Sequence, residues 1–222
     1  YGCYDFGMMR SMVKIAVPST LQQSIVHIGI LLVQSVINSF GSTAIAGYSA
    51  GMRIESLSIV PMLAMGNAMS TFTAQNMGAG KIDRVKEGYR MCYVIVLTAG
   101  AVLCVMYQLA GGAFVSLFLD SGSSEAYSVG LSYVKFLSFF YSFIGLKAST
   151  DGLLRGAGDV TAFTVANLVN LAIRVSVTNL FAPIYGIQVA WMAVPLGWAA
   201  NYVISFGWYL TGKWKKVRVI KK

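Results

Sequence analysis

The sequence is short of charge and of histidine, and each shortage excludes a class of protein. Charged residues make up 11% of the 222 positions, whereas 56% are hydrophobic. A soluble domain is usually about 25% charged, so this chain has too little charge to cover a surface in water. A single histidine, His27, excludes a multi-histidine metal centre, and no serine, histidine and acid can be placed together as a catalytic group. We therefore expect neither a soluble domain nor an enzyme.

Cysteine is also scarce. Cys3, Cys92 and Cys104 have neither the spacing of metal ligands nor that of a disulfide framework, so we expect no metal and no cofactor. The net charge of +9 would favour a nucleic-acid partner if the basic residues gathered on one water-exposed face. They lie instead between and after long apolar runs. The sequence therefore predicts a lipid bilayer as the partner, and no nucleic acid.

Long apolar runs are what the sequence has in abundance. A helix needs about 20 apolar residues to cross the hydrocarbon core of a bilayer, and six segments have this length and composition. We predict an all-α fold, an integral membrane bundle of six transmembrane helices. The expected spans are about 15–37, 45–74, 91–114, 129–150, 160–182 and 187–210.

The charges of the connecting segments predict the orientation. Short cytoplasmic loops carry an excess of lysine and arginine. Basic residues occur before the first span, between the second and third spans, between the fourth and fifth, and in the tail at 211–222. The alternate connections hold no basic residue and include Asp120 and Glu125. We therefore expect one membrane domain, residues 1–222, in the cytoplasmic (plasma) membrane, with the N and C termini and the basic tail cytoplasmic.

Ionisable residues within a span cost a few kcal/mol each, so they usually face a protein interior or an aqueous cavity. Four lie at similar expected depths: His27, Arg53, Glu55 and Arg174. Glu55 is the main candidate, because a buried carboxylate can exchange a proton or hold Na⁺ and so couple an ion gradient to transport. The alternative is a structural ion pair of Glu55 with Arg174. His27 could relay protons, or simply hydrogen-bond inside the bundle.

Amide side chains also lie within the expected spans. Gln34, Asn67 and Asn170 are candidates to line a path for a polar or cationic solute. Hydrogen bonding between helices would explain each of them equally well. We predict a hydrated interior without choosing which amides line it.

Several motifs follow one another along the chain in a distinctive order. They are Ile15-Ala16-Val17-Pro18, Arg53-Ile54-Glu55-Ser56, Gln75-Asn76-Met77-Gly78-Ala79-Gly80-Lys81 and Asp151-Gly152-Leu153-Leu154-Arg155-Gly156-Ala157-Gly158-Asp159. In these motifs the chain resembles the multidrug and toxic compound extrusion (MATE) family over nearly its whole length. The resemblance implies a C-terminal six-helix half, whose partner is an N-terminal six-helix half around a central cavity. The first residue, Tyr1 rather than Met, agrees with a fragment.

The resemblance also implies a function. It predicts a secondary active antiporter that exports a small organic, often cationic, compound while Na⁺ or H⁺ enters by alternating access. Some branches of the family carry acidic cation ligands in the seventh and tenth spans, yet this chain has Val26 and His27, and Ile144, near the expected places. Coupling in this half would therefore use Glu55, or rest on the other half. The alternatives are a lipid-linked oligosaccharide flippase, or a non-transporting membrane scaffold or truncated half.

Overall fold

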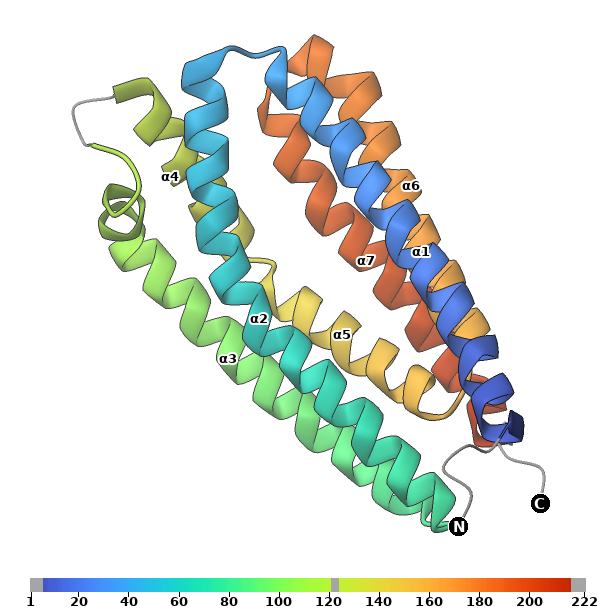
Figure 1. Cartoon of the computed structure of the whole chain (residues 1–222). Helices are drawn as coiled ribbons and strands as arrows, with labels where there is room; N and C mark the ends of the chain where they lie inside the picture. Colours follow the sequence, from blue (N-terminus) through green and yellow to red (C-terminus); the bar gives the residue numbers. More distant parts are fainter. Residues whose placement is uncertain (1–5, 121–123, 217–222) are drawn as a thin grey trace.

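The structure, a computed structural model, describes residues 6–120 and 124–216, and these residues are helical almost throughout (Figure 1). The predicted all-α fold is confirmed for this part of the chain. Residues 217–222, the end of the predicted basic tail, lie outside the described residues. The helices are α1 (Phe6–Asn38), α2 (Ser42–Gly78), α3 (Ile82–Ser116), α4 (Ser124–Ser138), α5 (Tyr141–Gly156), α6 (Val160–Tyr185), α7 (Gln188–Leu210) and the short 3₁₀ helix η1 (Lys213–Lys216).

Most of the long helices have the length and the hydropathy of membrane spans. Four of those that the structure describes meet both conditions, namely α2, α3, α6 and α7, and α4 with α5 makes a fifth if the bent pair is one span. In α1 the described apolar stretch is Ser24–Asn38, which is shorter than a full span. The structure therefore supports a multi-pass membrane protein with four or five spans, and the sixth span stays a prediction.

The span expected at 129–150 falls on two helices. α4 and α5 are bent by 53° at the break between Ser138 and Tyr141. Neither proline nor glycine occurs there, so the break depends on other side chains. The amide nitrogen of Gln108, from α3, donates to the carbonyl oxygen of Lys135 at 2.8 Å and to the hydroxyl of Ser138 at 2.9 Å. The Ser138 hydroxyl donates to the same carbonyl at 2.7 Å. A backbone group freed by the break thus finds partners inside the protein, as the bilayer requires.

The helices pack in two groups. α2 packs against α3, α4 and α5, whereas α6 packs against both α1 and α7, and contacts between α5 and α7 join the groups (Figure 1). Small residues allow the closest approach. A Cβ at Gly152 of α5 would clash with the carbonyl oxygen of Gly66 in α2, and a Cβ at Gly47 of α2 would clash with that of Ala126 in α4. This is how helices associate in a membrane, where packing replaces the hydrophobic effect between them.

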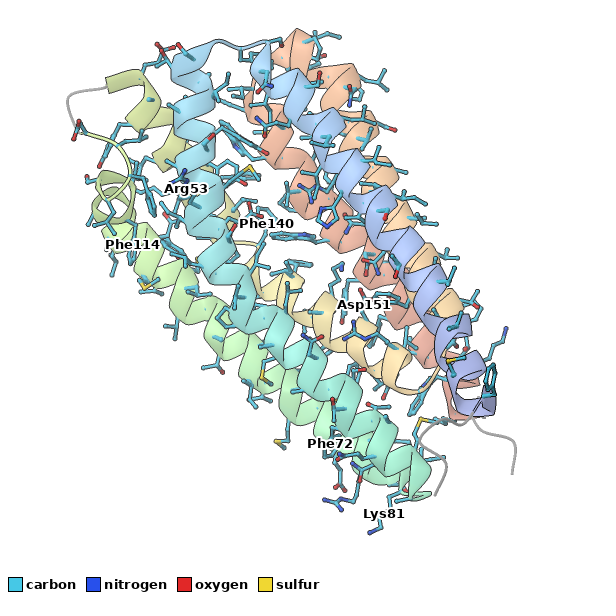
Figure 2. All side chains as sticks on the ribbon, viewed as in Figure 1. Arg53, Phe72, Lys81, Phe114, Phe140 and Asp151 are labelled. Carbon is cyan, nitrogen blue, oxygen red and sulfur yellow. The ribbon has the colours of Figure 1, made fainter. Side chains whose placement is uncertain are left out.

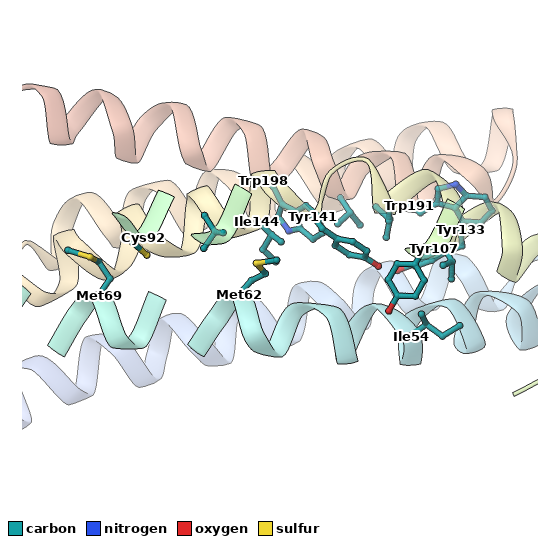
Figure 3. Close-up of a cluster of buried hydrophobic side chains, with 14 of the residues drawn as sticks. Ile54, Met62, Met69, Cys92, Tyr107, Tyr133, Tyr141, Ile144, Trp191 and Trp198 are labelled. Atoms are coloured by element: carbon teal, nitrogen blue, oxygen red, sulfur yellow. The ribbon is translucent and has the colours of Figure 1, made fainter. Parts of the chain in front are cut away.

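Large buried side chains fill the bundle between these helices. Figure 3 shows aromatic residues and methionines from α2, α3, α5 and α7 in one cluster, including Met62, Tyr107, Tyr141 and Trp198. The outward faces are apolar as well: Leu109 of α3 is 84% exposed and Val203 of α7 is 67% exposed. A surface of this kind is suited to lipid rather than to water.

Candidate functional site

The carboxylate of Glu55 is buried inside the bundle. Glu55 lies on α2 and is 8% exposed. It accepts a hydrogen bond from the hydroxyl of Tyr133, which lies on α4 and is 1% exposed. The Tyr133 ring makes edge-on contacts with Tyr48 of α2 at 5.2 Å and with Trp191 of α7 at 5.6 Å between ring centroids. The carboxylate therefore lies among aromatic rings from three helices.

Arg174 of α6 completes this group, which we call the Glu55 cluster (Tyr48, Glu55, Tyr133, Arg174 and Trp191). Its guanidinium is close enough to interact electrostatically with Glu55, Tyr48 and Tyr133. Within residues 6–120 and 124–216, however, salt bridges form elsewhere, at Lys86–Asp83 and Lys147–Asp151. The direct Glu55–Arg174 ion pair that the sequence allowed as an alternative is therefore not formed in this structure.

Asn170 adjoins the cluster along α6. A Cβ at Gly197 of α7 would clash with the amide oxygen of Asn170 and lie 3.0 Å from Cγ of Arg174, so both side chains pack on α7 at this glycine. Asn170 and Thr178 lie four residues before and after Arg174, on one face of the helix. The amide oxygen of Asn170 and the hydroxyl of Thr178 are buried without a hydrogen-bond partner among the described residues. Buried polar atoms are usually paired, so these two oxygens are available to a water, an ion or a solute.

The remaining predicted residues lie apart from the Glu55 cluster. Arg53 is exposed and its guanidinium lies 6.0 Å from the Phe118 ring. The Arg155 guanidinium donates to the amide oxygen of Asn67 at 2.7 Å. Asn67 lies twelve residues beyond Glu55, or about 18 Å along α2. Figure 2 shows that Arg53 and Phe114 lie toward one end of the bundle, Asp151 nearer its middle, and Lys81 at the other end.

Two predicted residues lie on α1. Gln34 donates to the side chain of Asn38 at 3.0 Å, within the same helix. His27 is exposed on α1, near the point where this helix packs against α6 at Gly29 and Leu171. The structure thus places Arg174 near Glu55 and Asn170 beside Arg174, and it leaves Arg53, Asn67 and Gln34 in other contacts.

A second buried carboxylate, which the sequence analysis missed, joins three helices. Asp151 of α5 forms a salt bridge with Lys147 at 3.1 Å, and their side chains are 6% and 13% exposed. Ser205 of α7 donates to Oδ1 of Asp151 at 2.6 Å, and Asn167 of α6 donates to Oδ2 at 3.3 Å. Asn167 also accepts from Lys147 at 3.1 Å. We call Lys147, Asp151, Asn167 and Ser205 the Asp151 cluster. Its sequence signal was the four-residue spacing of Lys147 and Asp151, which places both side chains on one helix face.

An apolar cavity of about 300 Å³ lies between the α4–α5 break and α7. None of the predicted site residues lines it. Its walls are Phe136, Phe140, Phe143, Met192, Pro195, Leu196 and Ala199. The cavity therefore offers apolar and aromatic contact without a charged group.

The two carboxylate clusters differ in what they can bind. Among the described residues, no group of three or more histidine, cysteine, aspartate or glutamate side chains could hold a metal ion. A monovalent cation at Glu55 would need oxygens from the carboxylate, the neighbouring hydroxyls and Asn170. A proton would need the carboxylate alone. Since a buried charge without full compensation is costly, the Glu55 site favours taking up one or the other.

Comparison with known proteins identifies the family. The family model described as MatE matches residues 18–180, which is most of the chain. The chain belongs to the MatE family. This confirms the resemblance seen in the motifs.

Curated relatives of this MatE chain are named as multidrug resistance proteins. It is 28% identical over 207 residues to the probable multidrug resistance protein YpnP of Bacillus subtilis, covering 93% of this chain and 46% of YpnP. It is 20% identical to the probable multidrug resistance protein NorM of Thermotoga maritima, covering 96% of this chain and 46% of NorM. The chain therefore spans about half the length of the curated relatives it matches.

A solved structure supports the fold. The outward-facing conformation of a multidrug resistance MATE family transporter of the MOP superfamily superposes on this chain with a TM-score of 0.86 at 19% sequence identity. The match covers 97% of this chain and 49% of that one. The arrangement of helices is thus that of half of a MATE transporter.

Proposed function

We propose that this chain is the C-terminal six-helix half of a secondary active antiporter that exports small organic, cationic compounds in exchange for Na⁺ or H⁺ by alternating access. The MatE family and the names of the curated relatives support multidrug export. The match to about half of each relative supports an N-terminal six-helix half as the partner. In this proposal α4 and α5 together form one span, so that α1, α2, α3, α4–α5, α6 and α7 make six.

The proposed orientation has both termini in the cytoplasm. α1 begins and α7 ends at the same end of the bundle as the α2–α3 turn (Figure 1). Lys81, Arg84 and Lys213 belong to this end, whereas Asp120 and Glu125 belong to the opposite end. An excess of basic residues is typical of the cytoplasmic side, which supports this orientation in the plasma membrane.

The observation that carries the mechanism is the buried, incompletely compensated carboxylate of Glu55. When ionised, Glu55 attracts Arg174 of α6 while it accepts a hydrogen bond from Tyr133 of α4. A proton or a Na⁺ on the carboxylate removes most of that attraction, and so changes how strongly α6 is held to α2 and α4. A ligand with different affinity for two states shifts the balance between them, which is the way an ion gradient drives alternating access.

The test uses the complete transporter, this chain with its N-terminal half, in sealed vesicles. Efflux of a fluorescent organic cation is measured under imposed Na⁺ and pH gradients for wild type and for Glu55→Gln. We expect efflux by the variant to lose its dependence on the driving ion. Glu125→Gln is the matched control, since it removes an exposed acid, and it should behave as wild type. Undiminished ion-coupled efflux by Glu55→Gln would remove Glu55 from the coupling role.

The same vesicles separate the alternatives. The multidrug resistance names of the relatives favour export of organic compounds over the flippase hypothesis. A flippase would move a fluorescent lipid-linked saccharide and leave the organic cation in place. A scaffold would move neither, although the reconstituted protein remained folded.

A further inference from the structure

α3 begins and α7 ends at the same end of the bundle (Figure 1), and basic side chains of α3 lie close to the end of α7. Lys86 and Arg90 of α3 both interact electrostatically with Tyr209 of α7. Lys215 of η1 interacts electrostatically with Asp83 of α3, which also forms a salt bridge with Lys86 at 2.7 Å. The first turns of α3 and the segment after α7 therefore share one surface.

The segment after α7 is held in place by its tryptophan. Trp214 is fully buried, its indole nitrogen donates to the carbonyl oxygen of Tyr209 at 3.0 Å, and the two rings stack with centroids 5.6 Å apart. Gly212, with φ of +67°, makes the turn that brings η1 back onto α7, in a region that favours glycine. Lys213 and Lys215 are therefore presented from a fixed segment, although both are exposed.

Each of these lysines lies beside an aromatic ring. The Lys213 ammonium is 5.1 Å from the Trp208 ring centroid, and that of Lys215 is 5.7 Å from Trp214. Cations on aromatic faces are typical of the membrane–water interface, where the ring is half-immersed and the charge reaches the headgroups. The surface contains four cations, namely Lys86, Arg90, Lys213 and Lys215, against two acids, Asp83 and Glu87.

The surface next to these cations, toward the middle of the bundle, is apolar. The hydroxyl of Tyr93 in α3 donates to that of Tyr202 in α7 at 3.2 Å, so side chains of the two helices meet there. Val94 of α3 is 59% exposed and Val203 of α7 is 67% exposed. This surface is complementary to an anionic phospholipid. Its cations match the charged headgroup, and the apolar face beside them matches the acyl chains.

We propose that this surface binds an anionic phospholipid, with its phosphate near Arg90, Lys213 and Lys215 and its acyl chains along Val94 and Val203. Basic residues beside a membrane helix attract acidic lipid headgroups, and the effect adds up with each cation. The bound lipid would bridge α3 and α7, which belong to the two different packing groups of the bundle. This proposal concerns a surface separate from the Glu55 cluster, and it does not depend on the transport mechanism.

The test is a binding titration of the full-length chain in detergent by calorimetry. The probes are a short-chain phosphatidylglycerol, a phosphatidylcholine with the same chains, and inorganic phosphate. We expect phosphatidylglycerol to bind at least tenfold more tightly than either of the others. In Lys213→Gln/Lys215→Gln the affinity for phosphatidylglycerol should fall about 25-fold, on the basis of roughly a factor of five for each cation.

The matched control is Lys81→Gln/Arg84→Gln, which removes the same charge from the same end of the bundle but spares η1, Lys86 and Arg90. We expect its affinity to stay within about threefold of wild type, since Lys81 and Arg84 would attract the headgroup only at longer range and screened by salt. Equal losses in the two double variants would overturn the site in favour of general charge attraction. If inorganic phosphate bound as tightly as phosphatidylglycerol, the proposal that the site binds a lipid would be wrong.

A second variant tests the same lipid site without any change in η1, in case substitutions there disturb folding. Arg90→Gln leaves η1 intact and should weaken phosphatidylglycerol binding about fivefold, by the loss of one cation near the headgroup. Wild-type affinity in Arg90→Gln, with an unchanged melting temperature, would contradict the proposed bridging of α3 and α7.

Discussion

Two of the buried carboxylates in the bundle, Glu55 and Asp151, are compensated very differently. Asp151 has a lysine and an asparagine on one oxygen and a serine on the other. Glu55 has one hydrogen bond from Tyr133, with Arg174 nearby but not in a salt bridge. A buried ion network with every atom satisfied is best explained as structure, whereas a carboxylate left under-compensated is suited to bind an ion. Burial alone therefore does not distinguish a structural carboxylate from a candidate ion-binding one.

Among the substitutions that test this comparison, the largest effect on stability is expected at Asp151. In Asp151→Asn the Lys147 ammonium stays buried without its counter-ion, so we expect the free energy of unfolding in mixed micelles to fall by about 3–5 kcal/mol. Denaturation followed by tryptophan fluorescence measures this change. The double variant Lys147→Met/Asp151→Leu, which removes both charges, should regain most of the loss. A double variant as unstable as Asp151→Asn would mean that the network matters for more than charge balance.

Glu55→Gln should have a much smaller effect on stability. Glutamine still accepts the hydrogen bond from Tyr133, so we expect the free energy of unfolding to change by about 1 kcal/mol or less in the same assay. Ion-coupled efflux should nevertheless be lost, as described above. If Glu55→Gln destabilised the fold as strongly as Asp151→Asn, the distinction between the two clusters would fail.

The energy of the Tyr133–Glu55 hydrogen bond can be measured with a double-mutant cycle. Tyr133→Phe, Glu55→Met and the double variant form a cycle in which each single change removes the hydrogen bond, and we expect a coupling energy of about 1–2 kcal/mol for a buried bond to a carboxylate. Tyr107→Phe is the matched control, because its hydroxyl pairs with Ser58 of α2 at 2.6 Å instead. A cycle of Tyr107→Phe with Glu55→Met should give a coupling energy near zero.

The smallest effect is expected at Arg53, which the sequence placed beside Glu55 as a site residue. Its side chain is exposed and lies 6.0 Å from Phe118, an interaction of about 0.5–1 kcal/mol at an exposed site. Arg53→Gln should therefore change stability by no more than this, and should leave ion-coupled efflux intact. A loss of coupling in Arg53→Gln would extend the site beyond the Glu55 cluster.

Much of this molecule could be predicted from its sequence. Composition and run length predicted a helical membrane bundle, and the motifs predicted the family, because both signals are local. The break at Ser138 could not be predicted in this way. The local sequence there, Ser138-Phe139-Phe140-Tyr141, has no helix-breaking residue, and Gln108, which satisfies the freed carbonyl, comes from another helix.

The candidate site was predicted less completely than the fold. The depth of Glu55 could be counted along its helix, but its partner Tyr133 lies 78 residues away in sequence. The predicted spans place Asp151 just after the fourth span, as part of a motif. In the structure it lies within α5, where it is 4% exposed. The spacing of Lys147 and Asp151 was visible, but their partners Asn167 and Ser205 belong to α6 and α7 and depend on tertiary packing.

The α4–α5 break also separates the two carboxylates mechanically. Tyr133, which donates to Glu55, lies before the break, and Asp151 lies after it, so the two clusters contact different helices of the bent pair. The helix that contacts one acid and the helix that carries the other therefore have different directions, 53° apart. The Gln108 amide, which donates to the Lys135 carbonyl and to Ser138, attaches this change of direction to α3.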